Sequence, residues 1–272
     1  MIKKEIKYNG ITVFWSLVDG TNRLLLGQGL EDLGCAHLIP EPRNDSQALG
    51  RAIRSQFPSK RTLIRPLQGV TGYAVVHENP NGQEMEYEEE VRFGFVNNEL
   101  FSNPQDHSLK DTIQQSYLVE KNLVTAAKLG GILVSACREL KGIPLRPRGG
   151  FYWIPEANKA RWEQIVGVVE KSNIANTIYC MKTTTDKTTL DAVCDSLVAQ
   201  VENKLSQLET DLEEGELGKR GLRTREKEAQ ELDDLVGTYE SILGKTLTSL
   251  RDRAEEVESA ASIAILEAMA DF

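Results

Sequence analysis

The sequence predicts an α+β protein in which a body of antiparallel strands and helices is followed by a long C-terminal helical hairpin. Strand-like segments, turn residues and helical patterns alternate in the first two thirds of the chain. A proline- and glycine-rich hairpin occurs near residue 150, and two long stretches with helical apolar spacing complete the chain. We therefore expect an N-terminal body over residues 1–182 and an antiparallel, coiled-coil-like helical hairpin over residues 183–272.

The first part of the body combines strand, turn and helix signals. β-branched and aromatic residues predict a strand over 11–18, and the turn residues of 19–22 predict a return strand over 23–26. Glycines predict a loop over 27–34. A capping Asp45 or Ser46 with an apolar stripe behind it predicts a helix to about residue 57.

An acidic ribbon is expected next. Strands are predicted over 61–67 and 70–78, and Asn79-Pro80-Asn81-Gly82 predicts a turn into a strand over 84–96. Glutamates occupy every second position from 84 to 90, so one face of this strand is expected in water.

The rest of the body contains two further predicted helices. After a loop over 97–106, one helix is expected from Ser108 to about Leu140, in which Gly130-Gly131 marks a kink, a break into two helices or close helix–sheet packing. Another helix is expected over 156–171, followed by a short buried strand over 176–182.

The segment 143–155 predicts a hairpin. Pro144 and Pro147 exclude a helix, Gly149-Gly150 permits a tight turn, and the aromatic run 151–154 favours a strand. Arg148 is expected at the tip. Two interpretations stay open: a core hairpin whose aromatic residues alternate inward, or a basic, aromatic-flanked loop that is presented to a ligand.

The second interpretation supplies candidate residues for binding nucleic acid or another ligand: Lys141, Arg146, Arg148, Gly149, Gly150 and Tyr152. Two helices divided at Gly130-Gly131 and followed by this hairpin resemble a winged helix-turn-helix, in which the hairpin contacts phosphates. The apolar run 132–137 argues against a helix that reads bases. The segment 146–151 resembles segments of uncharacterised bacterial and phage proteins, and this resemblance implies no function.

Two long helices are expected at the C-terminus, over about 186–214 and from about 222 almost to the end. Their apolar positions follow an eleven-residue repeat with spacing 3, 4, 4, 3, 4, from Cys194 to Leu212 and from Val236 to Ala254. The second helix is longer, so its apolar end should pack on the body or meet another chain. The candidate interface residues are Val257, Ala261, Ile265, Leu266 and Met269.

Composition limits the classes of partner and location. The net charge of −9 is uneven, because residues 183–272 carry 21 acidic and 10 basic side chains and residues 1–182 carry 20 and 22. A nucleic-acid partner is therefore more plausible for the body. The sequence contains no apolar run of about 20 residues and no signal-peptide pattern, so we expect no membrane span and a cytoplasmic protein with reduced cysteines.

The leading functional hypothesis is a non-enzymatic scaffold that self-associates or docks a protein partner through its C-terminal helices. The alternative is a nucleic-acid-binding protein that uses the basic hairpin. We expect no cofactor and no metal site, because the three histidines are far apart and no catalytic motif is present. An enzyme whose site is assembled from distant residues remains a third hypothesis.

Overall fold

The structure is a computed structural model of the chain and describes residues 8–81, 84–146, 149–184, 186–215 and 217–270. Helices account for 57% and strands for 23%, with antiparallel sheets, so the predicted α+β class is confirmed. The chain forms two compact units. Unit 1 holds the described residues of 1–16, 133–166 and 177–272, and unit 2 holds those of 17–132 and 167–176. These units do not follow the expected division between residues 182 and 183.

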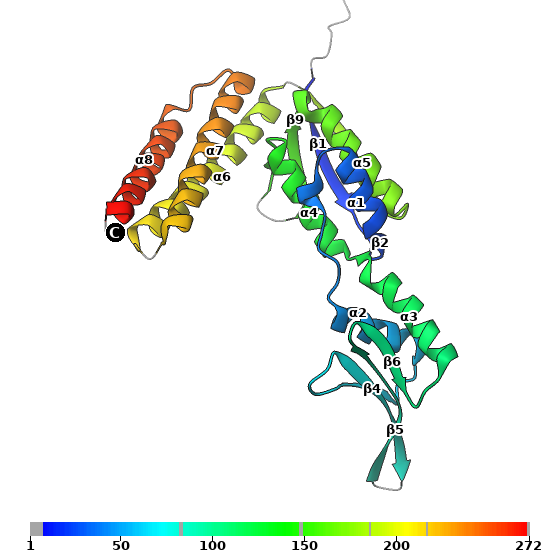
Figure 1. The fold of residues 1–272 in the computed structure, drawn as a ribbon. Helices are drawn as coiled ribbons and strands as arrows, with labels where there is room; N and C mark the ends of the chain where they lie inside the picture. Colours follow the sequence, from blue (N-terminus) through cyan, green and yellow to red (C-terminus); the bar gives the residue numbers. More distant parts are fainter. Residues whose placement is uncertain (1–7, 82–83, 147–148, 185, 216, 271–272) are drawn as a thin grey trace, which may run out of the picture. The chain divides into compact units, whose positions relative to one another are not determined.

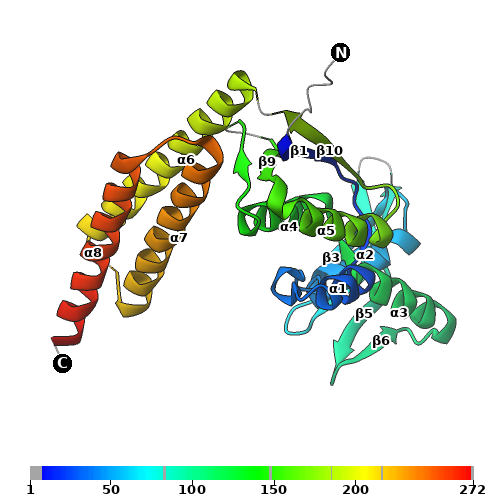
Figure 2. The same ribbon diagram turned by 90° about the horizontal axis from the view of Figure 1, so that it is seen from above.

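Unit 1 is built on a four-stranded antiparallel sheet with strand order β10–β1–β9–β8, of which Figure 1 labels β1 and β9 and Figure 2 labels β10, β1 and β9. The strands are Tyr8–Ser16 (β1), Ile143–Pro144 (β8), Phe151–Pro155 (β9) and Thr177–Thr184 (β10). Helix α4 (Ala126–Glu139) precedes β8, and a 3₁₀ turn η2 (Glu156–Asn158) and helix α5 (Lys159–Ser172) connect β9 to β10. A strand, a helix, two strands, a helix and a strand in this arrangement form the ferredoxin-like split βαβ topology.

The two faces of this sheet are covered by different elements. Helices α4 and α5 lie along one face (Figure 2). There the ring of Trp15 lies 6.3 Å from that of Trp162, whose indole N–H donates to Sγ of Cys180 over 3.3 Å. Side chains alternate between the faces along a strand. Phe14 and, through the register of β1 with β9, Trp153 therefore point to the opposite face.

Three helices form the C-terminal bundle of unit 1 and lie side by side (Figures 1 and 2): α6 (Lys187–Glu213), α7 (Lys219–Leu243) and α8 (Thr248–Ala270). Most of the expected apolar seam is buried: Cys194, Leu197, Val201, Leu205 and Leu208 on α6, and Val236, Tyr239 and Leu243 on α7. The same core includes Ile143 and Trp153 of the sheet. We call the face opposite α4 and α5 the free face of the sheet. The bundle packs on the part of this face that β8 and β9 form.

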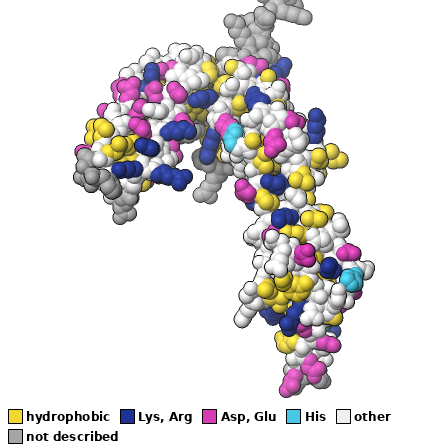
Figure 3. All heavy atoms as spheres, in the orientation of Figure 1, with side chains coloured by type: hydrophobic (Ala, Val, Ile, Leu, Met, Phe, Trp, Pro, Cys, Tyr) yellow, Lys and Arg dark blue, Asp and Glu magenta, His cyan; other side chains and the backbone are white. Residues whose placement is uncertain are grey.

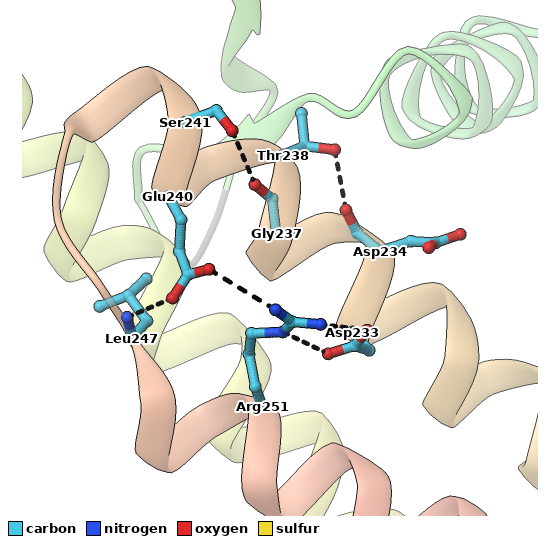
Figure 4. A network of polar contacts seen from close by, with 8 residues as sticks. All are labelled: Asp233, Asp234, Gly237, Thr238, Glu240, Ser241, Leu247 and Arg251. Atoms are coloured by element: carbon cyan, nitrogen blue, oxygen red, sulfur yellow. Dashed lines mark hydrogen bonds and ion pairs between the residues drawn. The ribbon is translucent and has the colours of Figure 1, made fainter.

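The prediction of one uninterrupted second helix was wrong, because the chain turns at Gly244. This glycine has φ +62°, the left-handed conformation that ends many helices, and its N–H donates to the carbonyl of Glu240. The Leu247 N–H donates to the Glu240 carboxylate, and Arg251 donates to Asp233 over 2.8 and 3.1 Å (Figure 4). The apolar end of the chain thus folds back along α7 as a third helix.

Unit 2 contains a second four-stranded antiparallel sheet, in the order β3–β4–β5–β6. Its strands are Thr62–Pro66 (β3), Gly72–Asn81 (β4), Glu84–Val96 (β5) and Glu99–Asn103 (β6). Helices α2 (Asp45–Gln56) and α3 (His107–Lys121) bury apolar side chains in one core with this sheet. The acidic ribbon is confirmed in part. The described glutamates of 84–90 are exposed, and Figure 3 shows acidic side chains at the end of the β4–β5 ribbon, but Met85 and Tyr87 on the other face of the strand are exposed as well.

Two local predictions in unit 2 were wrong. The expected strand over 23–26 and loop over 27–34 are helix α1 (Arg23–Asp32), because the Asn22 side chain accepts from the N–H groups of Leu24 and Leu25 and caps a helix. A 3₁₀ turn η1 (Ala36–Leu38) follows. The expected helix over 108–140 is two helices, α3 and α4. Between them β7 (Leu123–Val124) pairs with β2 (Thr21–Asn22), and Gly130-Gly131 lies within α4.

The turn at Gly244 gives a paired stability prediction. Gly237 lies within α7, and a Cβ added there meets no atom within 4 Å. Gly237→Ala should therefore stabilise the protein by about 0.5–1 kcal/mol. Gly244→Ala should destabilise it by about 1–2 kcal/mol, because an L-residue is strained at positive φ. Urea denaturation followed by circular dichroism measures both, and equal effects of the two substitutions would contradict the assigned turn.

Candidate functional site

Three aromatic side chains form a row across neighbouring strands on the free face of the unit 1 sheet. Phe14 on β1 lies directly opposite Tyr179 on β10 and Phe151 on β9. The rings of Phe14 and Tyr179 are stacked, with centroids 4.6 Å apart and planes inclined by 16°. The rings of Phe14 and Phe151 lie 6.0 Å apart. We call Phe14, Phe151 and Tyr179 the aromatic row.

The aromatic row is accessible to solvent. Tyr179 is 45% exposed, and Phe14 and Phe151 are half-buried. Met181, two residues beyond Tyr179 and on the same face, is 47% exposed. An apolar surface of this kind on three adjacent strands can accept a flat or apolar ligand.

One cation lies against the end of the aromatic row. The guanidinium carbon of Arg146 lies 5.9 Å from the ring centroid of Phe151, within the range of a cation–π interaction. The Arg146 Nε donates to the carbonyl of Gly149 over 3.2 Å, so the turn itself orients the side chain. Gly149 has φ +82°, which explains why glycine occupies this position. The hairpin therefore places a positive charge beside an aromatic surface.

The bundle determines how much of the free face stays open. Trp153, which shares this face, is fully buried, and its ring lies 5.6 Å from that of Tyr239 on α7. The Tyr239 hydroxyl donates to the carbonyl of Lys141 over 2.7 Å. A Cβ at Gly10 would lie 2.3 Å from the Trp153 ring, so glycine lets this indole lie across β1. The covered part of the face thus ends beside the aromatic row.

The hairpin residues predicted as one site do not share a surface. Arg146 lies beside Phe151, whereas Tyr152 points to the opposite face, where its ring stacks on Trp15 at 5.7 Å and burial raises its pKa. Gly150 also lies against the Trp15 ring. Lys141 ends the α4 segment with φ +57°. Arg148 lies outside the described residues.

The winged-helix arrangement lacks its expected parts. Gly130-Gly131 does not divide two helices, since it lies inside α4. The hairpin is not a projecting wing either, because β9 pairs with β1 on one side and β8 on the other. The basic hairpin thus forms the edge of a larger sheet.

The expected interface residues on the last helix separate into two groups. Val257 and Ala261 are buried in the bundle. Ile265 is half-buried, Leu266 is 67% exposed and Met269 is 55% exposed. An interface with another chain remains a prediction, and it now depends on Ile265, Leu266 and Met269.

Two further observations concern thiol and metal chemistry in the part of the chain that the structure describes. Burial raises the pKa of the Cys137 thiol, which disfavours a reactive thiolate. No three His, Cys, Asp or Glu side chains of the described residues gather closely enough to hold a metal ion. None of the described helices has both the length and the apolar character needed to cross a bilayer.

The sequence interpretation named no member of the aromatic row, Phe14, Phe151 or Tyr179, as a site residue. Each belongs to a segment that was expected to be a strand, but the pairing of residues 165 positions apart depends on the sheet order. Aromatic residues at one register position on three strands are the signal that could have identified them.

Comparison with known proteins identifies a family whose function is unknown. No curated protein and no solved structure matches the chain. A family model, described as a family of unknown function (DUF6744), matches residues 10–271, which include the aromatic row, the hairpin and the bundle. The chain therefore belongs to the family of unknown function DUF6744.

Proposed function

We propose that unit 1 binds single-stranded nucleic acid by stacking bases on the aromatic row. The observation that carries this proposal is the accessible alignment of Phe14, Phe151 and Tyr179 across three adjacent strands, with Arg146 at one end. Every nucleobase has a flat π-face, so aromatic side chains bind single strands with little dependence on sequence. A nearby guanidinium can contact a phosphate or stack on a base.

The topology of the sheet agrees with this proposal. RNA-recognition motifs bind single strands on the free face of a four-stranded sheet, where aromatic residues stack two or three bases. In this protein, helices cover one face and aromatic side chains lie on the other face of β1, β9 and β10. A shared topology does not establish a function. The proposal therefore rests on the accessibility of the aromatic row, in which Tyr179 is exposed and Phe14 and Phe151 are half-buried.

A purely structural role for the row is the main competing explanation. Cross-strand aromatic pairs stabilise sheets by about 0.2–1 kcal/mol relative to alanine pairs. That role requires contact between the rings, and it does not require their exposure. The two explanations differ in one measurable respect, because only the binding role makes Tyr179 important for nucleic-acid affinity.

Tyr179→Ala should weaken binding of short oligo(dT) or oligo(U) by about 1–3 kcal/mol, the usual contribution of one stacked base. Tyr179→Phe should bind like the wild type, since it keeps the ring. Tyr87→Ala is the matched control, because Tyr87 is another strand tyrosine, 60% exposed, in unit 2. Fluorescence anisotropy at low salt measures the affinities, and thermal unfolding checks that each variant is folded.

Arg146→Ala should reduce the slope of log K against log salt by roughly 0.7, the value for one phosphate contact on a single strand. A duplex should bind more weakly than the single strand, because its bases are stacked internally. The proposal fails if no single strand binds at low salt, or if Tyr87→Ala and Tyr179→Ala weaken binding equally.

A second candidate function is self-association through the end of α8. Ile263, Leu266 and Met269 are exposed apolar residues on this helix. We infer that the partner is a second copy of the chain. In a two-fold dimer the same surface of each copy meets the other, so these apolar residues would cover one another. Point substitutions test this better than removal of the end of α8, because the same helix also holds the buried Val257 and Ala261.

Leu266→Glu with Met269→Glu should convert an oligomer into a monomer, because the charges would be buried in the apolar interface. Light scattering measures the solution mass. Ile174→Glu is the control, since Ile174 is a fully exposed apolar residue in unit 2 and should not affect the mass. A wild-type chain that remains monomeric at all concentrations would exclude this candidate.

A further inference from the structure

Unit 2 contains a basic pocket that the aromatic row does not explain. It has a volume of about 400 Å³ and is lined by residues of α2, by Tyr73 of β4 and by the segment from Leu123 to Lys128. Its cationic residues are Arg43, Arg51, Arg54 and Lys128, and its lining includes no carboxylate. The volume lies in the range of small-molecule sites in proteins. We call these four cations and the space between them the basic pocket.

Helix α2 presents two different faces, and one of them builds the pocket. Its apolar face holds the buried Ala48, Leu49, Ala52 and Ile53, which join the core of unit 2. Gln47, Arg51 and Arg54 follow the spacing of the opposite helical face and line the pocket. Gly50 lies between the faces, where a Cβ would meet the Tyr73 ring at 3.1 Å. The core therefore fixes the direction of the two arginines.

The charges of the pocket are only partly neutralised. Arg43 is paired with the carboxylate of Glu120 and also donates to its carbonyl over 3.0 Å. The Lys128 ammonium donates to the backbone carbonyl of Glu41 over 3.3 Å, which leaves its charge uncompensated. Neither Arg51 nor Arg54 forms an ion pair with a carboxylate among the described residues. Like charges three positions apart on a helix repel, so this arrangement is unfavourable without an anion.

We propose that the basic pocket binds a ligand with two or more phosphate groups. Each phosphate carries up to two negative charges and several acceptor oxygens, and guanidinium groups match its geometry in a bidentate manner. The three uncompensated cations suit a diphosphate or triphosphate better than a single carboxylate. The phosphates can belong to a free polyphosphate or nucleotide, or to the backbone of a nucleic acid.

Binding of sodium tripolyphosphate to the full-length chain, measured by calorimetry at low salt, tests the proposal. Arg51→Ala with Arg54→Ala should weaken binding at least about tenfold, because two charge-assisted contacts are lost. The matched control is Arg223→Ala with Lys227→Ala, which removes two exposed cations from α7 and should leave the affinity unchanged. Citrate at equal ionic strength is the ligand control and should bind more weakly.

A second titration with a single-stranded oligonucleotide distinguishes a free polyphosphate or nucleotide from the phosphates of a nucleic-acid backbone. Tripolyphosphate binding that depends on Arg51 and Arg54 supports a free ligand. If only the oligonucleotide binds in a manner that depends on these arginines, its backbone is the source. Failure of both ligands to respond to the Arg51/Arg54 substitution overturns the proposal, and so does equal binding of citrate. Tyr179→Ala should not change tripolyphosphate binding, so failure here is distinguishable from failure of the aromatic row.

Discussion

Trp153 is the largest of the buried sheet side chains through which the sheet and the C-terminal bundle of unit 1 share one core. It is fully buried between β1 and Tyr239, and the absence of a side chain at Gly10 provides the space for its ring. Its indole N–H has no hydrogen-bond partner among the described residues, which costs about 1–3 kcal/mol. Burial of a tryptophan contributes about 4–6 kcal/mol by its apolar area. Packing therefore outweighs the unsatisfied donor at this position.

The position of the bundle follows from this contact and sets the extent of the open surface. Helices α4 and α5 cover one face of the sheet, and apolar side chains on the other face are buried only where another element packs against them. The bundle covers the part around β8 and β9, including Ile143 and Trp153, and stops before Phe14 and Tyr179. The bundle thus completes the core on one part of this face and leaves the aromatic row accessible on the other part.

The elements that could be predicted from the sequence are those whose signals are local. The β4–β5 ribbon is an example, because strand-forming residues on both sides of a turn signal predict two neighbouring strands. Its register was not predicted: Asn79–Asn81 continue β4 and pair with β5, and the register shifts between Val75 and Val76. The apolar seams of α6 and α7 were also predicted, since helical spacing is visible within one segment. The turn at Gly244 was missed because the apolar spacing continues through it.

The candidate site could be predicted only in part, because its geometry comes from distant pairings. Arg146 stood out through its unusual local sequence, and the structure places it beside an aromatic ring. Tyr152 was assigned to the same surface, although the alternation along β9 turns it to the opposite face. Phe14 and Tyr179 were not singled out, since no local pattern indicates that β1 and β10 are neighbours.

The strand order of unit 1 has a consequence for the time at which the chain can fold during synthesis. β1 is the first described element to be made, yet both of its neighbours, β9 and β10, follow residue 150. The sheet of unit 2 and its two flanking helices are complete by residue 121. A nascent chain thus carries an unpaired apolar strand while a later segment already folds, and such a strand is open to incorrect pairing. Pairing with β9 can cover one edge of β1 once Pro155 is released, and the other edge stays open until β10 is complete at Thr184.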